Sequence, residues 1–139
     1  MGNDVKMRVW RWICGLPAWT LTALCLAAIA WLTLASKPLG DTELPLFPHA
    51  DKLAHAIMFG GLAFCIMLDS LRQGRGRRFR ASTAVWAAVA SALVGLLTEV
   101  AQQVMDAGRS GDPLDLLADT AGAVAVAAVF YRLARRKAD

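Results

Sequence analysis

The stretch that decides the fold runs from Ala84 to Met105 and reads AVWAAVASALVGLLTEVAQQVM. Only one of its side chains, that of Glu99, is charged. Because roughly 20 helical residues cross the hydrocarbon core of a bilayer, this stretch is long and apolar enough to span a membrane as a helix. Three more stretches pass the same test, at residues 13–35, 53–71 and 114–133.

The composition of the whole chain agrees with a membrane protein. Hydrophobic residues make up 57% of it and charged residues 19%, whereas soluble domains are roughly 45 to 50% apolar. With four spans within 139 residues, we expect no soluble catalytic domain. We therefore predict an all-α fold, an integral membrane bundle of four transmembrane helices, that forms one domain over residues 1–139.

The first span follows a basic segment that contains Lys6, Arg8 and Arg11, which is the layout of a secretory signal peptide. Its apolar run is, however, longer than the roughly 7 to 15 residues of a cleavable signal. We predict an uncleaved anchor.

Basic side chains gather at the span ends that would share one side of the membrane, at residues 6–11, 72–80 and 132–137. By the positive-inside rule, this pattern predicts that the N- and C-termini are both cytoplasmic. In a bacterium the membrane is then the inner (cytoplasmic) membrane, and the lipid bilayer is the first partner. The net charge of +4 is explained by this orientation, so we expect no nucleic-acid partner.

Charged and polar residues lie at the other ends of the spans, although a charge at mid-bilayer costs roughly 2.5 to 3.5 kcal/mol. They are Asp51, Lys52 and His55 at the second span, Glu99 and Gln102 in the third, and Arg109, Asp112, Asp115 and Asp119 at the fourth. Helical spacing places each group on one face of its helix. We predict that the three faces converge on a polar pocket that opens toward the periplasm.

Helix capping is the simpler explanation for some of these acids. The run Asp112-Pro113-Leu114-Asp115 is a typical helix start, with Asp as the N-cap and Pro at the first helical position. Asp51 could cap the second span in the same way. Glu99 and Asp119 lie inside their spans, beyond the reach of a cap, so they are either functional or a buried structural pair.

Negative charge is in excess in the predicted pocket. If all ionise, its carboxyl groups face only two basic side chains, those of Lys52 and Arg109. Either some carboxyls stay protonated, or a cation or a cationic ligand binds. The candidate ligands of a divalent metal are His55, Glu99, Asp112, Asp115 and Asp119, without a fixed ligand spacing. Glu99 or His55 could equally serve as a general base, and His55 as an ordinary hydrogen-bonding histidine.

Taken together, the polar motifs resemble those of the VanZ-like family. They read Asp51-Lys52-x-x-His55-x-x-x-Phe59, Glu99-x-x-Gln102 and Arg109-x-x-Asp112-x-x-Asp115-x-x-Ala118-Asp119-x-x-Gly122, and they extend over residues 51–122. The resemblance implies a small polytopic bacterial membrane protein; the family is named for a member linked to teicoplanin resistance. The family pattern commonly has Asn at the position of Asp119, so this chain carries an additional negative charge there.

These observations lead to a hypothesis about function. We expect the pocket to bind an anionic component of the cell envelope, such as a polyprenyl-phosphate or the head group of a peptidoglycan precursor, with glycopeptide (teicoplanin) resistance as one physiological context. Lys52 and Arg109 would hold the anionic group, while the other polar residues of the motifs form the floor, orient the cations or bind a metal. Two alternatives remain: a membrane-embedded hydrolase or transferase that uses Glu99 or His55 as a base, and a non-catalytic assembly subunit with a protein partner.

Overall fold

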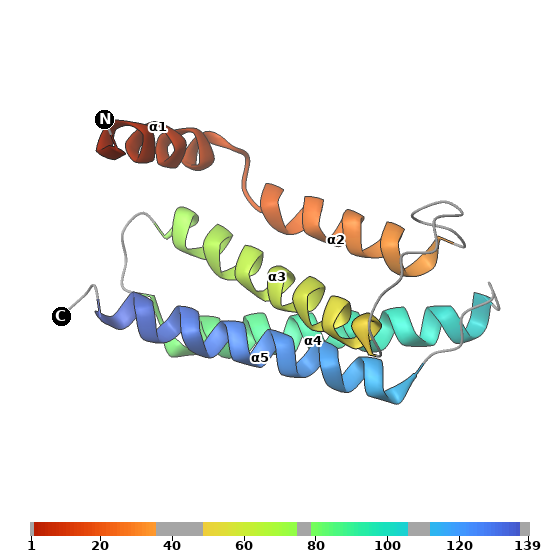
Figure 1. The fold of residues 1–139 in the computed structure, drawn as a ribbon. Helices are drawn as coiled ribbons and strands as arrows, with labels where there is room; N and C mark the ends of the chain where they lie inside the picture. The colour runs from red at the N-terminus through yellow and green to blue at the C-terminus, as the bar shows by residue number, and fades with distance from the viewer. Residues whose placement is uncertain (1, 36–48, 75–78, 106–111, 137–139) are drawn as a thin grey trace.

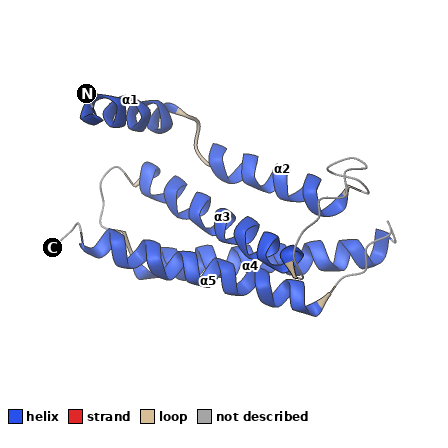
Figure 2. Ribbon diagram, viewed as in Figure 1, coloured by secondary structure: helices blue, strands red, loops and turns tan. Residues whose placement is uncertain are grey.

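The structure is a computed structural model of the chain, and it describes residues 2–35, 49–74, 79–105 and 112–136. These residues form helices and connecting turns, without a strand (Figure 2). The helices are α1 (Gly2–Gly15), α2 (Thr20–Leu34), α3 (Ala50–Gln73), α4 (Ala81–Met105) and α5 (Pro113–Arg136).

Helices α3, α4 and α5 pack along their lengths into a bundle, and α2 packs on the side formed by α3 and α4 (Figure 1). One cluster of the core is made of small or flexible side chains, among them Ala63, Met67, Ala87 and Ala123. Small residues let helix backbones approach closely, which is how helices associate where lipid is as apolar as the side chains. The bundle is therefore held by close packing.

Two glycines set the closest approaches. A Cβ atom on Gly122 of α5 would lie 2.1 Å from the carbonyl oxygen of Ala56 on α3, and one on Gly95 of α4 would lie 2.7 Å from Oδ2 of Asp119 on α5. Both distances are shorter than the 3.0 Å below which real Cβ contacts are essentially never found, so a larger residue would force the helices or the Asp119 side chain to shift. Gly61 of α3, in contrast, has open space beside it.

Three helices, α3, α4 and α5, are each long and apolar enough to cross a membrane. The expectation of one continuous first span over residues 13–35 is corrected, because the helix breaks between α1 and α2 with a bend of 80°. Pro17 lies in the break and cannot donate a backbone hydrogen bond, and Trp19 adopts a left-handed conformation with φ 62°. The structure thus has three candidate spans, or four if the bent pair counts as one.

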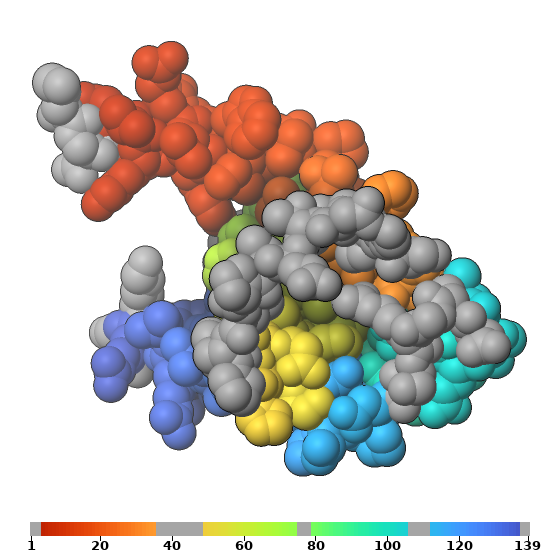
Figure 3. Space-filling view, turned by 45° about the vertical axis from the view of Figure 1, so that its right-hand side comes forward, coloured from red at the N-terminus to blue at the C-terminus, as the bar shows by residue number. Residues whose placement is uncertain are grey.

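The polar motifs lie together at one end of the bundle. The start of α3, the end of α4 and the start of α5 meet there, as Figure 3 shows in yellow, cyan and light blue. The start of α1 and the end of α5 lie at the opposite end (Figure 1). The cytoplasmic location of the termini stays a prediction.

Candidate functional site

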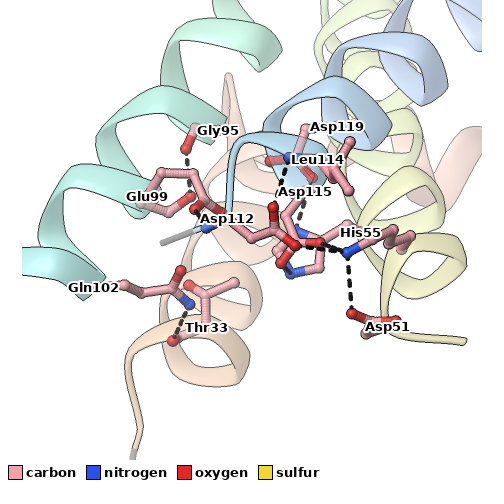
Figure 4. A network of polar contacts seen from close by, with 12 residues as sticks. Thr33, Asp51, His55, Gly95, Glu99, Gln102, Asp112, Leu114, Asp115 and Asp119 are labelled. Atoms are coloured by element: carbon pink, nitrogen blue, oxygen red, sulfur yellow. Dashed lines mark hydrogen bonds and ion pairs between the residues drawn. The ribbon is translucent and has the colours of Figure 1, made fainter. Parts of the chain in front are cut away.

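Three helices supply the polar side chains at this end. Figure 4 shows Asp112, Asp115 and Asp119 between Glu99 of α4 and His55 of α3. The arrangement follows from helical periodicity, because Asp112, Asp115 and Asp119 advance by three and four residues along the start of α5. The polar faces of the three helices therefore converge in the structure, as the sequence predicted.

The innermost contact joins His55 and Asp119. The His55 Nδ1 atom lies 2.9 Å from Oδ1 of Asp119, whose side chain is fully buried. The ring of His55 stacks on that of Phe59, with the ring centroids 6.3 Å apart. The second oxygen of Asp119, Oδ2, is buried and has no hydrogen-bond partner among the described residues.

Glu99 enters the same centre from α4, and only 6% of the residue is exposed. Its Oε2 atom accepts a hydrogen bond of 2.7 Å from the backbone N–H of Asp112. Its Oε1 atom is buried and, within the described part of the chain, unpartnered. One side-chain atom each from His55, Glu99 and Asp119 lie within 4.8 Å of one another. We call these three residues the inner cluster.

Lys52 forms an outer rim with three aspartates. Its Nζ atom donates to Oδ1 of Asp115 at 2.8 Å and to Oδ2 of Asp112 at 2.9 Å, and it contacts Oδ2 of Asp51 at 3.4 Å. An ammonium group has three N–H donors, so each of them faces a carboxylate. The hydrogen bond from Lys52, followed by the one from the Leu114 amide, holds the pKa of the Asp112 carboxyl below its usual range.

Capping and site geometry coincide at Asp112. Its Oδ1 atom accepts a hydrogen bond of 2.9 Å from the N–H of Leu114, so the residue caps α5 while it also contacts Lys52 and Glu99. Asp51 does not occupy the N-cap position of α3, which is taken by His49 without a side-chain hydrogen bond. Asp51 lies in the first turn, where an acid still complements the helix dipole.

One residue of the predicted ligand-binding set, Gln102, lies outside the inner cluster and the rim. Gln102 is buried, and its Nε2 atom donates to the carbonyl oxygen of Thr33 at 2.8 Å, which ties the end of α4 to the end of α2. Gln102 therefore serves helix packing beside the inner cluster. Arg109, the second predicted cation, lies outside the described residues.

A second polar network, which the sequence reading missed, lies near the opposite end of the bundle. The buried Asp69 of α3 pairs with Arg72 through Oδ1, and its Oδ2 accepts hydrogen bonds from the N–H and the Oγ1 of Thr22 at 2.9 and 2.8 Å. Arg72 also donates to the carbonyl oxygen of Leu16 at 2.9 Å. The signal was present in the sequence as an acid and a base three residues apart on one helix.

Among the described residues, the polar end of the bundle contains more carboxyl groups than basic groups. The described carboxyl groups at the polar end are those of Asp51, Glu99, Asp112, Asp115 and Asp119. Lys52 and, when protonated, His55 are the basic groups that contact them in the described part of the chain. The inner cluster and the rim together therefore carry an excess of negative charge if all ionise, and they retain two unpaired buried oxygens.

The fold and the site define a multi-pass α-helical membrane protein with a polar centre at one end of its bundle. Comparison with known families agrees: the family model described as VanZ/LLP1 matches residues 11–135, almost the whole chain. The chain belongs to the VanZ/LLP1 family, as its sequence motifs predicted. No curated protein and no solved structure gave a match.

Proposed function

We propose that this VanZ/LLP1 protein binds the anionic head group of a cell-envelope component at the polar end of its bundle. The ligands that we propose are a polyprenyl-phosphate or the head group of a peptidoglycan precursor. The observation that carries the proposal is how the three N–H donors of Lys52 are engaged. Two of its donors are fixed by Asp112 and Asp115, but the third makes a long contact of 3.4 Å with Asp51, whose side chain is 63% exposed. A phosphate oxygen can replace Asp51 there without disturbing the two shorter bonds.

The surroundings of the rim suit an amphiphilic ligand. Apolar side chains next to it on α3 and α5 are exposed, namely Leu53, Ile57, Leu114 and Leu117. In a membrane these side chains face hydrocarbon, so a prenyl or acyl chain could lie along them while its head group reaches Lys52. This arrangement supports a lipid-linked ligand over a free soluble anion.

The negative charge of the pocket sets a condition on binding. An anionic head group enters a site with an excess of carboxylates favourably only when cations accompany it. Lys52 supplies one, and we propose that Arg109 supplies another.

The same proposal includes an orientation. The polar end would face the periplasm of a bacterial inner membrane, and both termini would be cytoplasmic. Support comes from basic residues at the opposite end of the bundle, which are Arg72, Arg80, Arg132, Arg135 and Arg136. A role in glycopeptide resistance stays a prediction for this chain.

Native mass spectrometry of protein gently extracted from its own membranes tests the head-group proposal. We expect the wild type to carry a phosphorylated lipid that Lys52→Met loses and that Lys6→Met retains, because Lys6 lies on α1, remote from the site. Asp51→Asn should retain the lipid or bind more of it, since it leaves Lys52 held by Asp112 and Asp115 and frees its third donor. Equal occupancy in the wild type and Lys52→Met would reject the role of Lys52.

A second function, a membrane-embedded hydrolase or transferase, is favoured by one specific contact. The buried Asp119 carboxylate holds Nδ1 of His55 at 2.9 Å, and Nε2 lies 3.8 Å from Oδ2 of Asp115 near the rim. A carboxylate that fixes one ring nitrogen and leaves the other free is how histidine is oriented as a general base. Turnover of a phosphorylated lipid that persists in both His55→Ala and Glu99→Gln would exclude this mechanism.

A further inference from the structure

We propose that the inner cluster, His55, Glu99 and Asp119, binds one divalent transition-metal ion of the Mn²⁺ or Zn²⁺ kind. The inference concerns the buried centre beneath the rim, and it does not depend on the ligand that Lys52 binds. Four observations support it.

The first observation is a pair of carboxylate oxygens without partners. Glu99 Oε1 and Asp119 Oδ2 are both buried, belong to different helices, and have no hydrogen-bond partner in the described part of the chain. Only 6% of Glu99 and none of Asp119 is exposed. A buried polar atom left unpaired costs roughly 1 to 3 kcal/mol, and more for a charged group. Two such oxygens in one small cluster are what a cation would satisfy.

The second observation is spacing. Neighbouring ligands about 2.1 Å from one ion are roughly 3.0 Å apart, and opposite ligands roughly 4.2 Å apart. One possible ligand atom from each of His55, Glu99 and Asp119 lies within 4.8 Å of the other two. Small side-chain rotations would bring all three onto one ion.

The third observation compares the metal ion with the simplest substitute, which is a proton. A proton on Glu99 Oε1 would turn that atom into a hydrogen-bond donor, but it has no acceptor within hydrogen-bond distance among the described residues. A proton on Asp119 Oδ2 meets the same difficulty. Protonation therefore removes charge and leaves both buried atoms unpaired, whereas one metal ion can bind both carboxylates and the imidazole.

The fourth observation is that the candidate ligands are held in place by other groups. The N–H of Asp112 fixes Oε2 of Glu99 at 2.7 Å, and Phe59 stacks on the ring of His55. Gly95 leaves the room that the Asp119 carboxylate occupies. Such supporting contacts orient metal ligands in known sites. A ligand set of one imidazole and two carboxylates suits Mn²⁺ and Zn²⁺, since imidazole favours Zn²⁺ and carboxylate favours Mn²⁺.

The test uses the full-length protein in detergent, treated with a chelator and then titrated with Mn²⁺ or Zn²⁺ alone. We expect one ion per chain in the wild type, together with a rise in the unfolding temperature that grows with metal concentration. Asp119→Asn and Glu99→Gln should each weaken binding at least tenfold and lose that rise. Asp4→Asn, which changes an exposed acid of α1 at the opposite end of the bundle, should bind like the wild type.

The variants keep the proposal falsifiable, because each replaces a carboxylate by an amide of the same shape and the metal-free protein should still fold. A folded, chelator-treated wild type that takes up neither ion at millimolar concentration would overturn the site. Binding with unchanged affinity in both Asp119→Asn and Glu99→Gln would also overturn it. No lipid takes part in the titration, so its outcome is independent of the Lys52→Met experiment.

Discussion

Each end of the bundle contains a fully buried aspartate, and the two differ in how many of their oxygens have hydrogen-bond partners. Both oxygens of Asp69 are engaged, one by Arg72 and the other by the backbone and hydroxyl of Thr22. Asp119 pairs with His55 through one oxygen only, and the other has no partner among the described residues. The first aspartate completes a structural connection between helices, and the second belongs to a centre that can accept something more.

The buried side-chain atoms that lack a hydrogen-bond partner also differ between the two ends. At the Asp69 end the unpaired buried atom in the described part of the chain is a donor, Nε of Arg72, beside a balanced pair of charges. At the Asp119 end the unpaired atoms are acceptors, on carboxylates that outnumber the basic groups around them. A buried charge pair is neutral as a unit, whereas an excess of buried carboxylate requires a cation or protons. The comparison therefore assigns a structural role to the Asp69 end and supports the proposal that the Asp119 end binds a ligand.

The largest effect should come from breaking the structural end. Asp69→Ala leaves the guanidinium of Arg72 buried without its carboxylate and releases Thr22 of α2, so we expect unfolding to become easier by about 3 to 5 kcal/mol. Denaturant titration in mixed micelles measures this free energy. The double variant Asp69→Ala/Arg72→Met should recover part of the loss, because it removes the stranded charge. A loss below about 1 kcal/mol in the single variant would show that the pair is not structural.

A smaller loss of stability is expected at the contact between α4 and α5. Gly95→Ala would place a Cβ 2.7 Å from Oδ2 of Asp119 and displace that carboxylate, so we expect a loss of about 1 to 3 kcal/mol together with weaker metal uptake. Gly61→Ala is the matched control on α3, since a Cβ there meets nothing within 4 Å. The control should lose no stability, because alanine favours the helix and its Cβ meets no other atom there. Equal effects of the two alanines would mean that the contact between Gly95 and Asp119 is not a constraint.

The sequence predicted the class, the family and the position of the polar groups for identifiable reasons. Hydropathy over 20 residues identifies the spans in α3, α4 and α5, and helical spacing brings Asp112, Asp115 and Asp119 onto one face. The same window could not detect the break near Pro17, because the apolar run of residues 13–35 continues through it. Hydropathy averages side chains and ignores backbone geometry.

Contacts between distant segments were harder to anticipate. Gln102 looked like part of the pocket because it follows Glu99 by one helical turn, but its amide reaches the Thr33 carbonyl at the end of α2. No local pattern predicts that the end of α2 lies beside α4. Asp69 and Arg72 were overlooked because Arg72 was interpreted as an orientation signal only, and their burial depends on how α2 packs on α3.

Without metal, the Glu99→Gln variant is expected to be more stable than the wild type. Glu99→Gln removes one carboxylate from the centre that contains Asp115 and Asp119, so the metal-free variant should unfold about 1 kcal/mol less readily than the metal-free wild type. Saturating Mn²⁺ should reverse that order, because only the wild type gains from binding. Unfolding titrations with chelator and with metal measure both differences. A metal-free variant less stable than the metal-free wild type would place Glu99 among the structural acids, like Asp69.

The smallest effect should come from the rim, and its dependence on pH has a definite sign. The pKa of Asp112 in the folded protein is lowered by hydrogen bonds from Lys52 and the Leu114 amide. The ionised carboxyl therefore stabilises the fold at pH values above the unfolded pKa, which is about 3.9. That contribution is lost as the pH falls through the lower pKa of the folded state. Asp112→Asn keeps the N-cap and removes the charge. The wild type should therefore be more stable than Asp112→Asn from about pH 5 upward, and the difference should shrink as pH falls below about 4. Unfolding of both proteins across this range measures it, and a difference that grows on acidification would show that the Lys52 contact does not stabilise the ionised form.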